Sequence, residues 1–247
     1  GSTDALERSI ARYSFLHLTF PIMPLRSMLS QSVEDYLKAI YKLQAENPVS
    51  TTDLAEKLNI TAASVTNMAK RLSSLGLVTY APYKGVRLTE SGEQIALEII
   101  RHHRLLETYL RQIMGYDWDE MHDEAEHLEH HISEEFEDRL DKMLGYPTHD
   151  PHGDPIPGRD GTIISIESHP VTSFPEGVEL TIRRVSDSNV DMLRKLESMG
   201  LLPGATCKLI SKSEDTLEVV TSQNRFELDA ELASHVFATE STKTDFA

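Results

Sequence analysis

Histidine and carboxylate side chains recur at helical spacing in the middle of the chain. His103 and Glu107 are four residues apart, so on a helix they share one face. A second set lies at intervals of four, seven and eight residues from its first member and again selects one face: His122, Glu126, Glu129 and His130. Burying these groups together without a cation is costly, whereas a divalent metal removes the repulsion and uses each group as a ligand. A solvated acidic helix face explains the same spacing, and spacing alone leaves both interpretations open.

The charge of the chain is concentrated around these groups. The formal net charge is −16, and residues 117–141 hold twelve carboxylates and one arginine. Eight of the eleven histidines lie between 102 and 152. An acidic chain is unsuited to coating nucleic acid nonspecifically, which needs a positive field, but one face can still bind DNA specifically. Residues 29–100 are nearly neutral, with seven basic and eight acidic residues.

Cysteine usage and hydropathy limit the class of protein. The single cysteine, Cys207, excludes an intramolecular disulfide and any multi-cysteine zinc or iron–sulfur site, and it suits a reducing cytoplasm. The most apolar stretch, 13–25, is too short to span a membrane and contains a proline. We therefore expect a cytoplasmic protein with no membrane partner. Residues 1–27 are expected to be a tag remnant and a disordered extension, and no function is assigned to them.

The first patterned region predicts a DNA-binding fold over residues 28–93. Apolar residues at helical spacing predict a helix that ends at Asn47-Pro48, and Ser50–Asp53 caps a second helix. A third helix begins at Thr61 and ends at Gly76. Two short strands, 77–80 and 86–89, flank a turn. Three helices followed by a β-hairpin form a winged helix-turn-helix.

The third helix carries small and hydrogen-bonding residues in its first turns and basic residues after them. Asn67 can read adenine, the small apolar side chains can contact thymine methyl groups, and the basic residues can hold phosphates. The candidate DNA-binding residues are Thr61, Ala62, Ala63, Ser64, Thr66, Asn67, Lys70, Arg71 and the wing residue Lys84. A winged helix used only for protein contact is the alternative.

The remainder of the chain changes from helical to β patterning. One long helix is predicted to about Ile113 and another from Asp119 to Leu144, which together form a helical domain over 94–147. A loop rich in glycine, proline and aspartate makes 148–174 a linker. Short strands around a helix predict a small β-barrel over 175–240. The expected fold class is mainly α with a C-terminal β domain.

Several segments together closely resemble the diphtheria-toxin-repressor family of metal-dependent transcriptional regulators. They are SVEDYLKAIYKL, RHHRLLE, HDEAEHLEHHIS, DPHGDPIPG and MGLLPGA, in the family's order over about residues 29–236. The resemblance implies a winged helix, a helical dimerisation and metal domain, and a C-terminal Src-homology-3-like (FeoA-like) barrel. It favours the metal interpretation of the histidine and carboxylate spacing.

The resemblance also implies two metal sites. The primary site would use Asp35, Glu126, Glu129 and His130. The second would use His103, Glu107, His122, Asp150 and His152, with Asp187 from the barrel. The iron-sensing branch has Met and Cys at the positions of Asp35 and Glu126, and two carboxylates there favour Mn²⁺. Barrel-less manganese regulators have a Glu in place of Lys38, so we expect two separated sites rather than a close binuclear centre.

The resemblance implies that the protein acts in metal homeostasis as a manganese-responsive repressor of metal-uptake genes. Mn²⁺ would promote binding of a homodimer to a palindromic DNA operator. No organic small-molecule substrate and no enzymatic activity are expected. An iron-responsive regulator of the same fold, with Fe²⁺ as its cofactor, is the main alternative, and other divalent transition metals would bind in vitro. A helical di-metal metalloenzyme and a metal-buffering protein are the remaining alternatives, although neither needs a DNA-binding helix.

Overall fold

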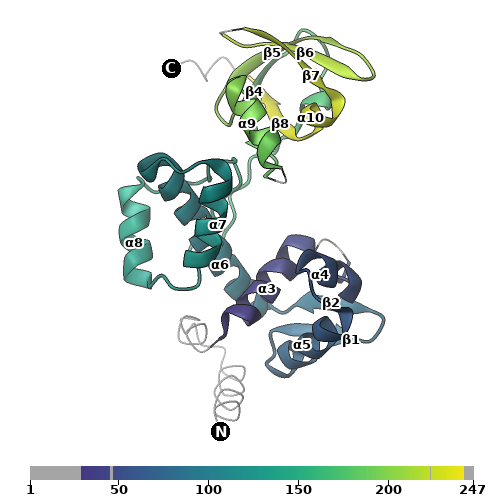
Figure 1. Cartoon of the computed structure of the whole chain (residues 1–247), viewed down its shortest axis with the longest axis vertical. Coiled ribbons are helices and arrows are strands. Elements are labelled where there is room, and N and C mark those ends of the chain that lie inside the picture. Colours follow the sequence, from purple (N-terminus) through teal and green to yellow (C-terminus); the bar gives the residue numbers. More distant parts are fainter. Residues whose placement is uncertain (1–28, 45–46, 188, 223, 242–247) are drawn as a thin grey trace. The chain divides into compact units, whose positions relative to one another are not determined.

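The computed structural model describes residues 29–44, 47–187, 189–222 and 224–241. These residues, drawn as coloured ribbon in Figure 1, form two units. Unit 1 contains the described residues up to His102 together with 157–161, and unit 2 contains 103–156 and the described residues from Thr162 onward. The N-terminal extension expected over 1–27 lies outside the described residues. None of the helices in the described ranges combines the length and hydropathy needed to cross a bilayer.

Unit 1 is a winged helix-turn-helix, as the sequence predicts. Its elements are α3 (Gln31–Leu43), α4 (Thr51–Lys57), α5 (Ala62–Ser74), β1 (Val78–Ala81) and β2 (Gly85–Leu88). The Ser50 hydroxyl accepts a hydrogen bond from the Asp53 amide at 3.0 Å, and the Thr61 hydroxyl accepts one from the Ser64 amide at 3.2 Å. These caps satisfy amides at the beginnings of α4 and α5, where the helices have no acceptor of their own.

The wing of unit 1 is a two-stranded hairpin that is joined to the α3–α4 connection by one further bridge. β1 and β2 pair antiparallel, and Val49 adds a bridge through two backbone hydrogen bonds with Val86, both 2.8 Å long. Val65 and Leu72 on the inner face of α5 are fully buried together with Leu77 and Val86 of the wing. Burial of these apolar side chains fixes the wing against α5.

The long helix α6 (Glu90–Tyr109) belongs to both units and continues as a π-helical turn, η1 (Leu110–Met114), that ends at Gly115. Within unit 1 it is joined by the returning segment 157–161. The Arg101 guanidinium donates a hydrogen bond to the Pro157 carbonyl at 2.9 Å, and Leu97 lies beside Gly161. The winged-helix unit is therefore assembled from two separate stretches of the chain.

One predicted helix in unit 2 is in fact two. The expected helix from Asp119 to Leu144 is interrupted after residue 128, giving α7 (Trp118–Leu128) and α8 (Glu134–Met143). The Ser133 hydroxyl accepts from the Phe136 amide at 3.2 Å and starts the second helix. The predicted apolar stripe is only partly buried as a consequence. Leu140 is 2 % exposed, whereas Phe136 is 46 % exposed and Met143 is 55 % exposed.

The C-terminal part of unit 2 is an antiparallel sheet with strand order β3-β8-β4-β5-β6-β7. The strands are β3 (His169–Pro170), β4 (Glu179–Val185), β5 (Thr206–Lys212), β6 (Thr216–Val220), β7 (Arg225–Asp229) and β8 (Val236–Glu240). The helices are η2 (Val171–Ser173), α9 (Val190–Ser198) and α10 (Ala230–Ser234). Sequence patterning predicts β4 to β7 and α9, but it does not identify β3, β8 or α10. The strand β3 also precedes residue 175, the expected start of this domain.

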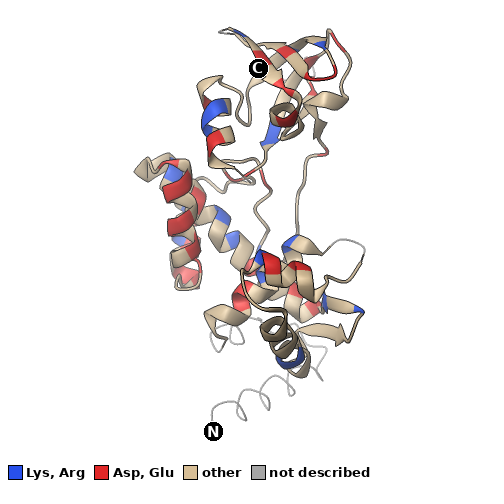
Figure 2. Ribbon diagram, turned by 45° about the vertical axis from the view of Figure 1, so that its right-hand side comes forward, with Lys and Arg blue, Asp and Glu red and all other residues tan. Residues whose placement is uncertain are grey.

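Acidic residues gather on the helices of unit 2. Figure 2 shows α8 as a helix coloured largely red, and the first turns of α7 and α8 both contain carboxylates. Carboxylates at a helix N-terminus interact favourably with the helix dipole. The exposed Glu135, for example, pairs with Arg139 one turn later, at 2.6 Å. Most of this part of the charge run is a solvated face, although Glu137 of α8 is buried.

Candidate metal centre

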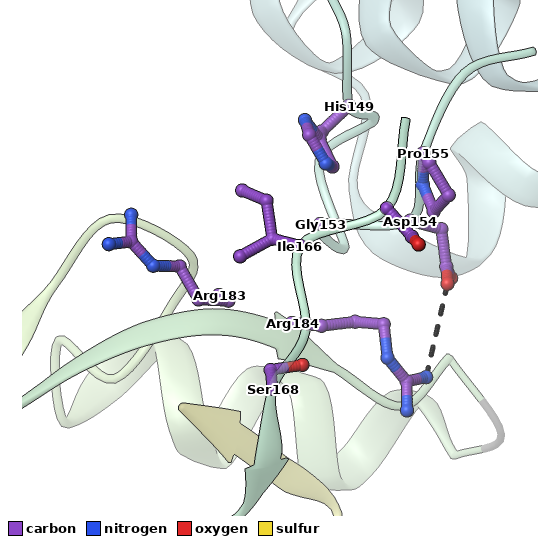
Figure 3. Close-up of a pocket in the computed structure, with 9 residues that line it drawn as sticks. His149, Gly153, Asp154, Pro155, Ile166, Ser168, Arg183 and Arg184 are labelled. Atoms are coloured by element: carbon purple, nitrogen blue, oxygen red, sulfur yellow. Dashed lines mark ion pairs between the residues drawn. The ribbon is translucent and has the colours of Figure 1, made fainter. Parts of the chain in front are cut away.

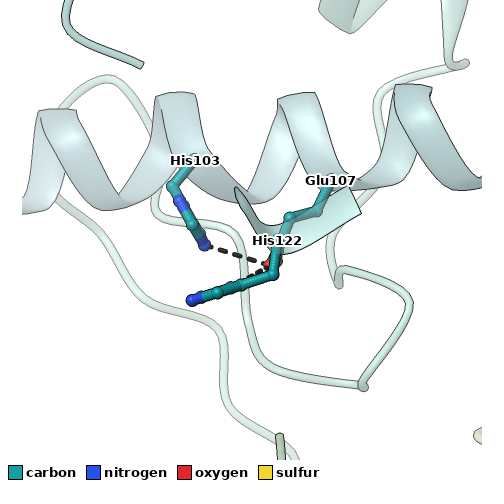
Figure 4. A group of neighbouring side chains, drawn as sticks. All are labelled: His103, Glu107 and His122. Carbon is teal, nitrogen blue, oxygen red and sulfur yellow. Dashed lines mark hydrogen bonds and ion pairs between the residues drawn. The ribbon is translucent and has the colours of Figure 1, made fainter. Parts of the chain in front are cut away.

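His103, Glu107 and His122 meet between α6 and α7 (Figure 4). One carboxylate oxygen of Glu107, Oε1, lies 3.0 Å from His103 Nε2 and 3.0 Å from His122 Nδ1. His103 and Glu107 lie one turn apart on α6 and are almost completely buried. His122 comes from the middle of α7, and its side chain is 40 % exposed. Nitrogen and oxygen donors converge here from two helices, with solvent access on one side.

His103 also contacts the carboxylates that follow along α7. Its other ring nitrogen, Nδ1, lies 2.6 Å from Glu129 Oε2, and Glu129 is completely buried. Glu126 Oε1 is 3.9 Å from His103 Nδ1 and 3.9 Å from His122 Nε2. His103, Glu126 and Glu129 can therefore present one ligand atom each to a common point. His103 is shared between this group and the group with Glu107 and His122.

The electrostatics of the cluster show how it is neutralised by protons. Burial alone would lower the pKa of His103, but the charges and hydrogen bonds of Glu107 and Glu129 outweigh burial and raise it to about 9. Burial alone would raise the pKa of Glu107, but its histidine neighbours, led by His103, hold it well below the ordinary value. A protonated His103 therefore supplies the positive charge that two buried carboxylates require.

The cluster fits a divalent metal on chemical grounds. A metal ion provides more positive charge than the proton on His103 and accepts lone pairs from both nitrogen and oxygen. The donors are imidazoles and carboxylates, and Cys207, the single cysteine, is buried in β5 within the sheet. The donor set is therefore that of a nitrogen- and oxygen-ligated divalent cation.

His152 lies at the edge of the cluster with its ring nitrogens unused. Neither nitrogen has a hydrogen-bond partner among the described residues, although the side chain is 3 % exposed. Its Nε2 lies 3.9 Å from Glu107 Oε1, and its ring centroid lies 5.0 Å from that of Trp118. Burial lowers the pKa of His152 and keeps the imidazole neutral. A buried neutral imidazole with a free lone pair fits the role of a further metal ligand.

Asp150, predicted as a ligand in the same loop, is engaged elsewhere. Its Oδ1 accepts hydrogen bonds from the amides of His152 and Asp154, both 2.9 Å long, and its Oδ2 lies 3.4 Å from Arg104 Nε. Burial raises the pKa of this carboxyl well above the ordinary value. These contacts order the loop that carries His152. Asp187, predicted from the barrel, is exposed, although its charge acts on His152.

The residues predicted for the primary site lie in different units. Asp35 is half-buried on α3 in unit 1, whereas Glu126, Glu129 and His130 lie in unit 2, on α7 and directly after it. His130 Nε2 lies 3.3 Å from Glu129 Oε1. Glu129 thus contacts His130 through one oxygen and His103 through the other. A site that includes Asp35 stays a prediction.

The predicted DNA-binding residues lie along α5 and at the wing. Thr61, Ala62, Ala63, Ser64, Asn67, Lys70, Arg71 and Lys84 are exposed, and Thr66 is half-buried. Two hydroxyls are already used within the helix, because Thr61 caps it and Thr66 donates to the Ala62 carbonyl at 2.9 Å. The remaining polar and basic side chains are presented to solvent by a helix whose other face is locked in the core.

Two residues that support the cluster were not identified from the sequence. Arg104 follows His103 directly and binds Asp150, while Trp118 packs on His152 and donates its indole N–H to Glu197 at 3.1 Å. Two sequence features could have identified them: Arg104 belongs to the RHHRLLE segment, and Trp118 is the single tryptophan of the chain. Both act through the His152 loop.

A separate small cavity lies between the same loop and β4 (Figure 3). It has a volume of about 140 Å³ and is lined by nine residues, including His149, Arg183 and Arg184. The two arginines point away from each other in Figure 3, and Arg184 pairs with Asp154 at 3.9 Å. Because their charges do not converge, this cavity is not assigned a ligand.

Comparison with known families finds matches to three successive parts of the chain. Residues 28–86 match the N-terminal DNA-binding domain of iron-dependent repressors, and residues 89–158 match the metal-binding and dimerisation domain of these repressors. Residues 169–240 match the FeoA domain.

Individual relatives and solved structures are similar over most of their length. An uncharacterized HTH-type transcriptional regulator of Methanocaldococcus jannaschii is 46% identical over 114 residues, covering 45% of this chain and 91% of the relative. The iron-dependent repressor IdeR of Mycobacterium tuberculosis is 32% identical over 195 residues, covering 72% of this chain and 83% of the relative. A solved manganese-dependent transcriptional repressor in complex with manganese is 35% identical and has a TM-score of 0.75. That match covers 85% of this chain and all of the other.

Proposed function

The chain belongs to the diphtheria-toxin-repressor family of metal-dependent transcriptional repressors, and we propose that the metal to which it responds is Mn²⁺. Members of this family are DNA-binding repressors rather than enzymes, so the alternative of a di-metal metalloenzyme does not apply. We further propose that it acts in the cytoplasm as a homodimer that binds a palindromic operator and represses genes for metal uptake. No organic small-molecule substrate is required.

One observation carries the choice of metal: the buried donors around His103 are nitrogen and oxygen atoms. Glu107 and Glu129 lie within 3.0 Å of the ring of His103. The single thiol, that of Cys207, is buried and its pKa is raised to about 11 by burial, so it is held as a neutral thiol within the sheet. Carboxylate ligands suit Mn²⁺, whereas thiolate and thioether ligands suit softer metals. The relatives include both manganese-dependent and iron-dependent repressors, so Fe²⁺ is the second candidate.

We assign the ligands to two groups. His103, Glu107, His122 and His152 would hold one cation, and Asp150 would order the loop that presents His152. Asp35, Glu126, Glu129 and His130 would hold the other. A bound divalent cation supplies positive charge and a fixed coordination geometry. His103 would give up its extra proton when the cation binds, and Asp35 would tie α3 to the ligands on and after α7.

The proposed regulation links these ligands to the spacing of two recognition helices. Asp35 lies on α3, and α3 packs in the same core as α5. Fixing α3 therefore restricts where α5 is presented, and a dimer with fixed α5 helices matches half-sites one or more helical turns apart. The exposed Phe136 and Met143 of α8 support an apolar dimer contact. Because linkage is reciprocal, operator DNA must tighten metal binding by the same factor as metal tightens DNA binding.

The proposal is tested by binding to a duplex selected from a random double-stranded library with the wild-type protein and Mn²⁺. Affinity is then titrated with Mn²⁺, Fe²⁺ and Zn²⁺ at buffered free concentrations. For each metal, the free concentration that half-saturates DNA binding is compared with the free concentration available in the cell. Mn²⁺ is expected to have the lowest ratio of the two. A chelator is expected to abolish the footprint. Equal affinity with and without metal would reject metal-dependent repression for this chain.

Substitution of the ligands separates the two candidate metals. Asp35→Ala and Glu126→Ala are expected to raise the Mn²⁺ concentration that half-saturates DNA binding. The matched control is Glu135→Ala, which removes an exposed carboxylate from α8 that pairs only with Arg139 among the described residues. The double variant Asp35→Met, Glu126→Cys is expected to shift selectivity toward Fe²⁺. Unchanged selectivity would contradict the argument from ligand softness and favour the iron-responsive alternative.

A further inference from the structure

Tyr83 at the tip of the wing combines two unfavourable features. Its relative exposure is 108 %, so the whole aromatic ring faces solvent. Its φ is +63°, in the left-handed region that side chains other than glycine rarely adopt. Backbone strain opposes folding, and a ring that stays in water contributes no burial free energy to offset that strain. Strained residues of this kind cluster at functional sites, which indicates that Tyr83 contacts a ligand.

The turn itself favours glycine at this position. The Lys84 amide donates to the Ala81 carbonyl at 3.0 Å, which closes a four-residue β-turn with Pro82 second and Tyr83 third. A turn with proline second and a positive φ third is the type II arrangement, for which glycine is the preferred third residue. Tyrosine is therefore present despite the turn geometry, not because of it.

The turn that carries Tyr83 is attached to a rigid part of the fold. The hydrogen bonds between Val49 and Val86 clamp the base of the wing to the α3–α4 connection. Gly85 lets the two segments meet, because a Cβ there would lie 2.6 Å from the Val49 carbonyl oxygen. Val86 is completely buried in the same core as the inner face of α5. Tyr83 is thus positioned by the same core that positions the recognition helix.

The electrostatic surroundings of Tyr83 suit DNA. The 33 residues from Lys57 to Thr89 contain five basic residues and no carboxylate, in a chain whose formal net charge is −16. Two of these basic residues lie in the wing: Lys84 follows Tyr83 directly, and Arg87 lies further along β2. A neutral or basic protein partner would not need this sign segregation, whereas the phosphate backbone of DNA is complementary to it.

From these observations we propose that Tyr83 inserts its ring into the minor groove of the DNA duplex, beside the major groove occupied by α5. This inference rests on the proposed DNA-binding function and adds a second groove to it. The minor groove is about 6 Å wide, so a flat ring fits between the two sugar–phosphate walls. The phenol hydroxyl can donate to the N3 or O2 acceptors that A·T pairs present on the groove floor. Lys84 would hold the adjoining phosphate.

The first test compares stability with DNA affinity in full-length variants. The probe is a duplex selected by wild-type protein and Mn²⁺ from a random double-stranded library. Tyr83→Gly is expected to keep or raise the thermal unfolding midpoint, because it relieves the positive φ, and to weaken binding of the duplex about tenfold. Tyr83→Phe keeps the ring but loses the hydroxyl, so its affinity should fall between those of wild type and Tyr83→Gly.

The matched control is Tyr146→Gly. Tyr146 also has a positive φ, +60°, and is 64 % exposed, but it lies in unit 2. Light scattering in the same samples checks that the oligomeric state is unchanged. The control should share the thermal behaviour of Tyr83→Gly and bind the duplex with wild-type affinity. A change of oligomeric state in Tyr83→Gly would instead make the wing tip a protein contact and overturn the proposal.

The second test identifies the groove. Replacing adenine by 2,6-diaminopurine in the flanks of the selected duplex adds an amino group on the minor-groove floor and leaves the major-groove edge unchanged. Wild-type affinity should fall on this duplex, whereas Tyr83→Gly should bind both duplexes equally. Equal sensitivity of the two proteins, or unchanged affinity of Tyr83→Gly in the first test, overturns the minor-groove assignment. If wild-type protein with metal selects no duplex at all, the proposed function itself fails.

Discussion

The two candidate sites of this chain differ in where their functional groups lie. On α5 the candidate DNA-binding side chains are almost all exposed, and the apolar face beneath them, with Val65 and Leu72, is fully buried. Between α6 and α7 the arrangement is reversed, because His103, Glu107 and Glu129 are themselves buried. The winged helix can fold without its ligand, since its binding groups stay hydrated. The helical cluster folds only with something to neutralise it, so its stability and its binding are coupled.

Removing metal should affect the two regions unequally, and this is the largest effect expected. At a free metal concentration 100-fold above the dissociation constant, binding stabilises the folded state by about 2.7 kcal/mol. Hydrogen exchange should therefore speed up on chelation in the second half of α6 and in α7, with α4 and α5 little changed. Uniform loss of protection across both units would remove the distinction drawn between them.

The pH dependence of the metal-free protein should come from the helical cluster. His103 has an ordinary pKa of 6.5, and its neighbours Glu107 and Glu129 raise that pKa to about 9 in the fold. Its contribution to stability is then complete below pH 6.5 and is lost as the pH rises through about 9. The thermal midpoint of chelated protein should fall over this window.

The metal-loaded protein provides the comparison for that measurement. A ligating imidazole has already lost its proton, so no such decline is expected with Mn²⁺ bound. His103→Gln should likewise flatten the pH profile of the chelated protein. A decline of equal size in loaded, chelated and substituted protein would assign the pH dependence to other groups.

Asn67→Ala should separate binding from stability on the exposed site. Loss of a base contact is expected to weaken operator binding by about 1–3 kcal/mol. An exposed helical side chain contributes little to folding, so the free energy of unfolding should change by less than about 0.5 kcal/mol. Competition binding and urea unfolding measure the two quantities. A large loss of stability would show that the α5 surface is also structural.

Thr61 is both a candidate DNA contact and the N-cap of α5, and its substitution should have the smallest effect of those predicted. Its hydroxyl caps the helix by accepting from the Ser64 amide, so Thr61→Ala should cost about 1 kcal/mol of unfolding free energy. Thr61→Ser keeps the cap and should restore stability. If Thr61→Ala proves neutral in urea unfolding, the cap contributes nothing and the position serves DNA alone.

The winged helix could be predicted from the sequence because its signals are local. Thr61 marks the start of α5 and Gly76 marks its end, and both lie next to the elements that they bound. The break between α7 and α8 was missed because apolar residues keep helical spacing through it. Ser133 caps α8, but Phe136 stands where a capping box would place glutamate or glutamine.

The contacts of the metal cluster could not be predicted from the sequence, because they join residues that are far apart in the chain. Helical spacing places His103 and Glu107 together, but the contact between His103 and Glu129 joins residues 26 apart. Arg104 and Asp150 lie even further apart in the sequence, and their pairing gives the carboxylate a role that spacing could not suggest. Family resemblance indicated that these residues belong to one region. Only the packing of α6 against α7 and the loop indicates which atoms meet.

The short segment 157–161 has a consequence for how the protein is made. Arg101 and Leu97 find their partners in this segment, 56 residues or more further along the chain. During synthesis on a ribosome, the winged helix would emerge first but would lack this final piece until the whole helical region had been translated. A nascent chain arrested before residue 157 should therefore hold α6 less firmly than the finished protein does. The order of translation delays completion of the first unit until much of the second has been made.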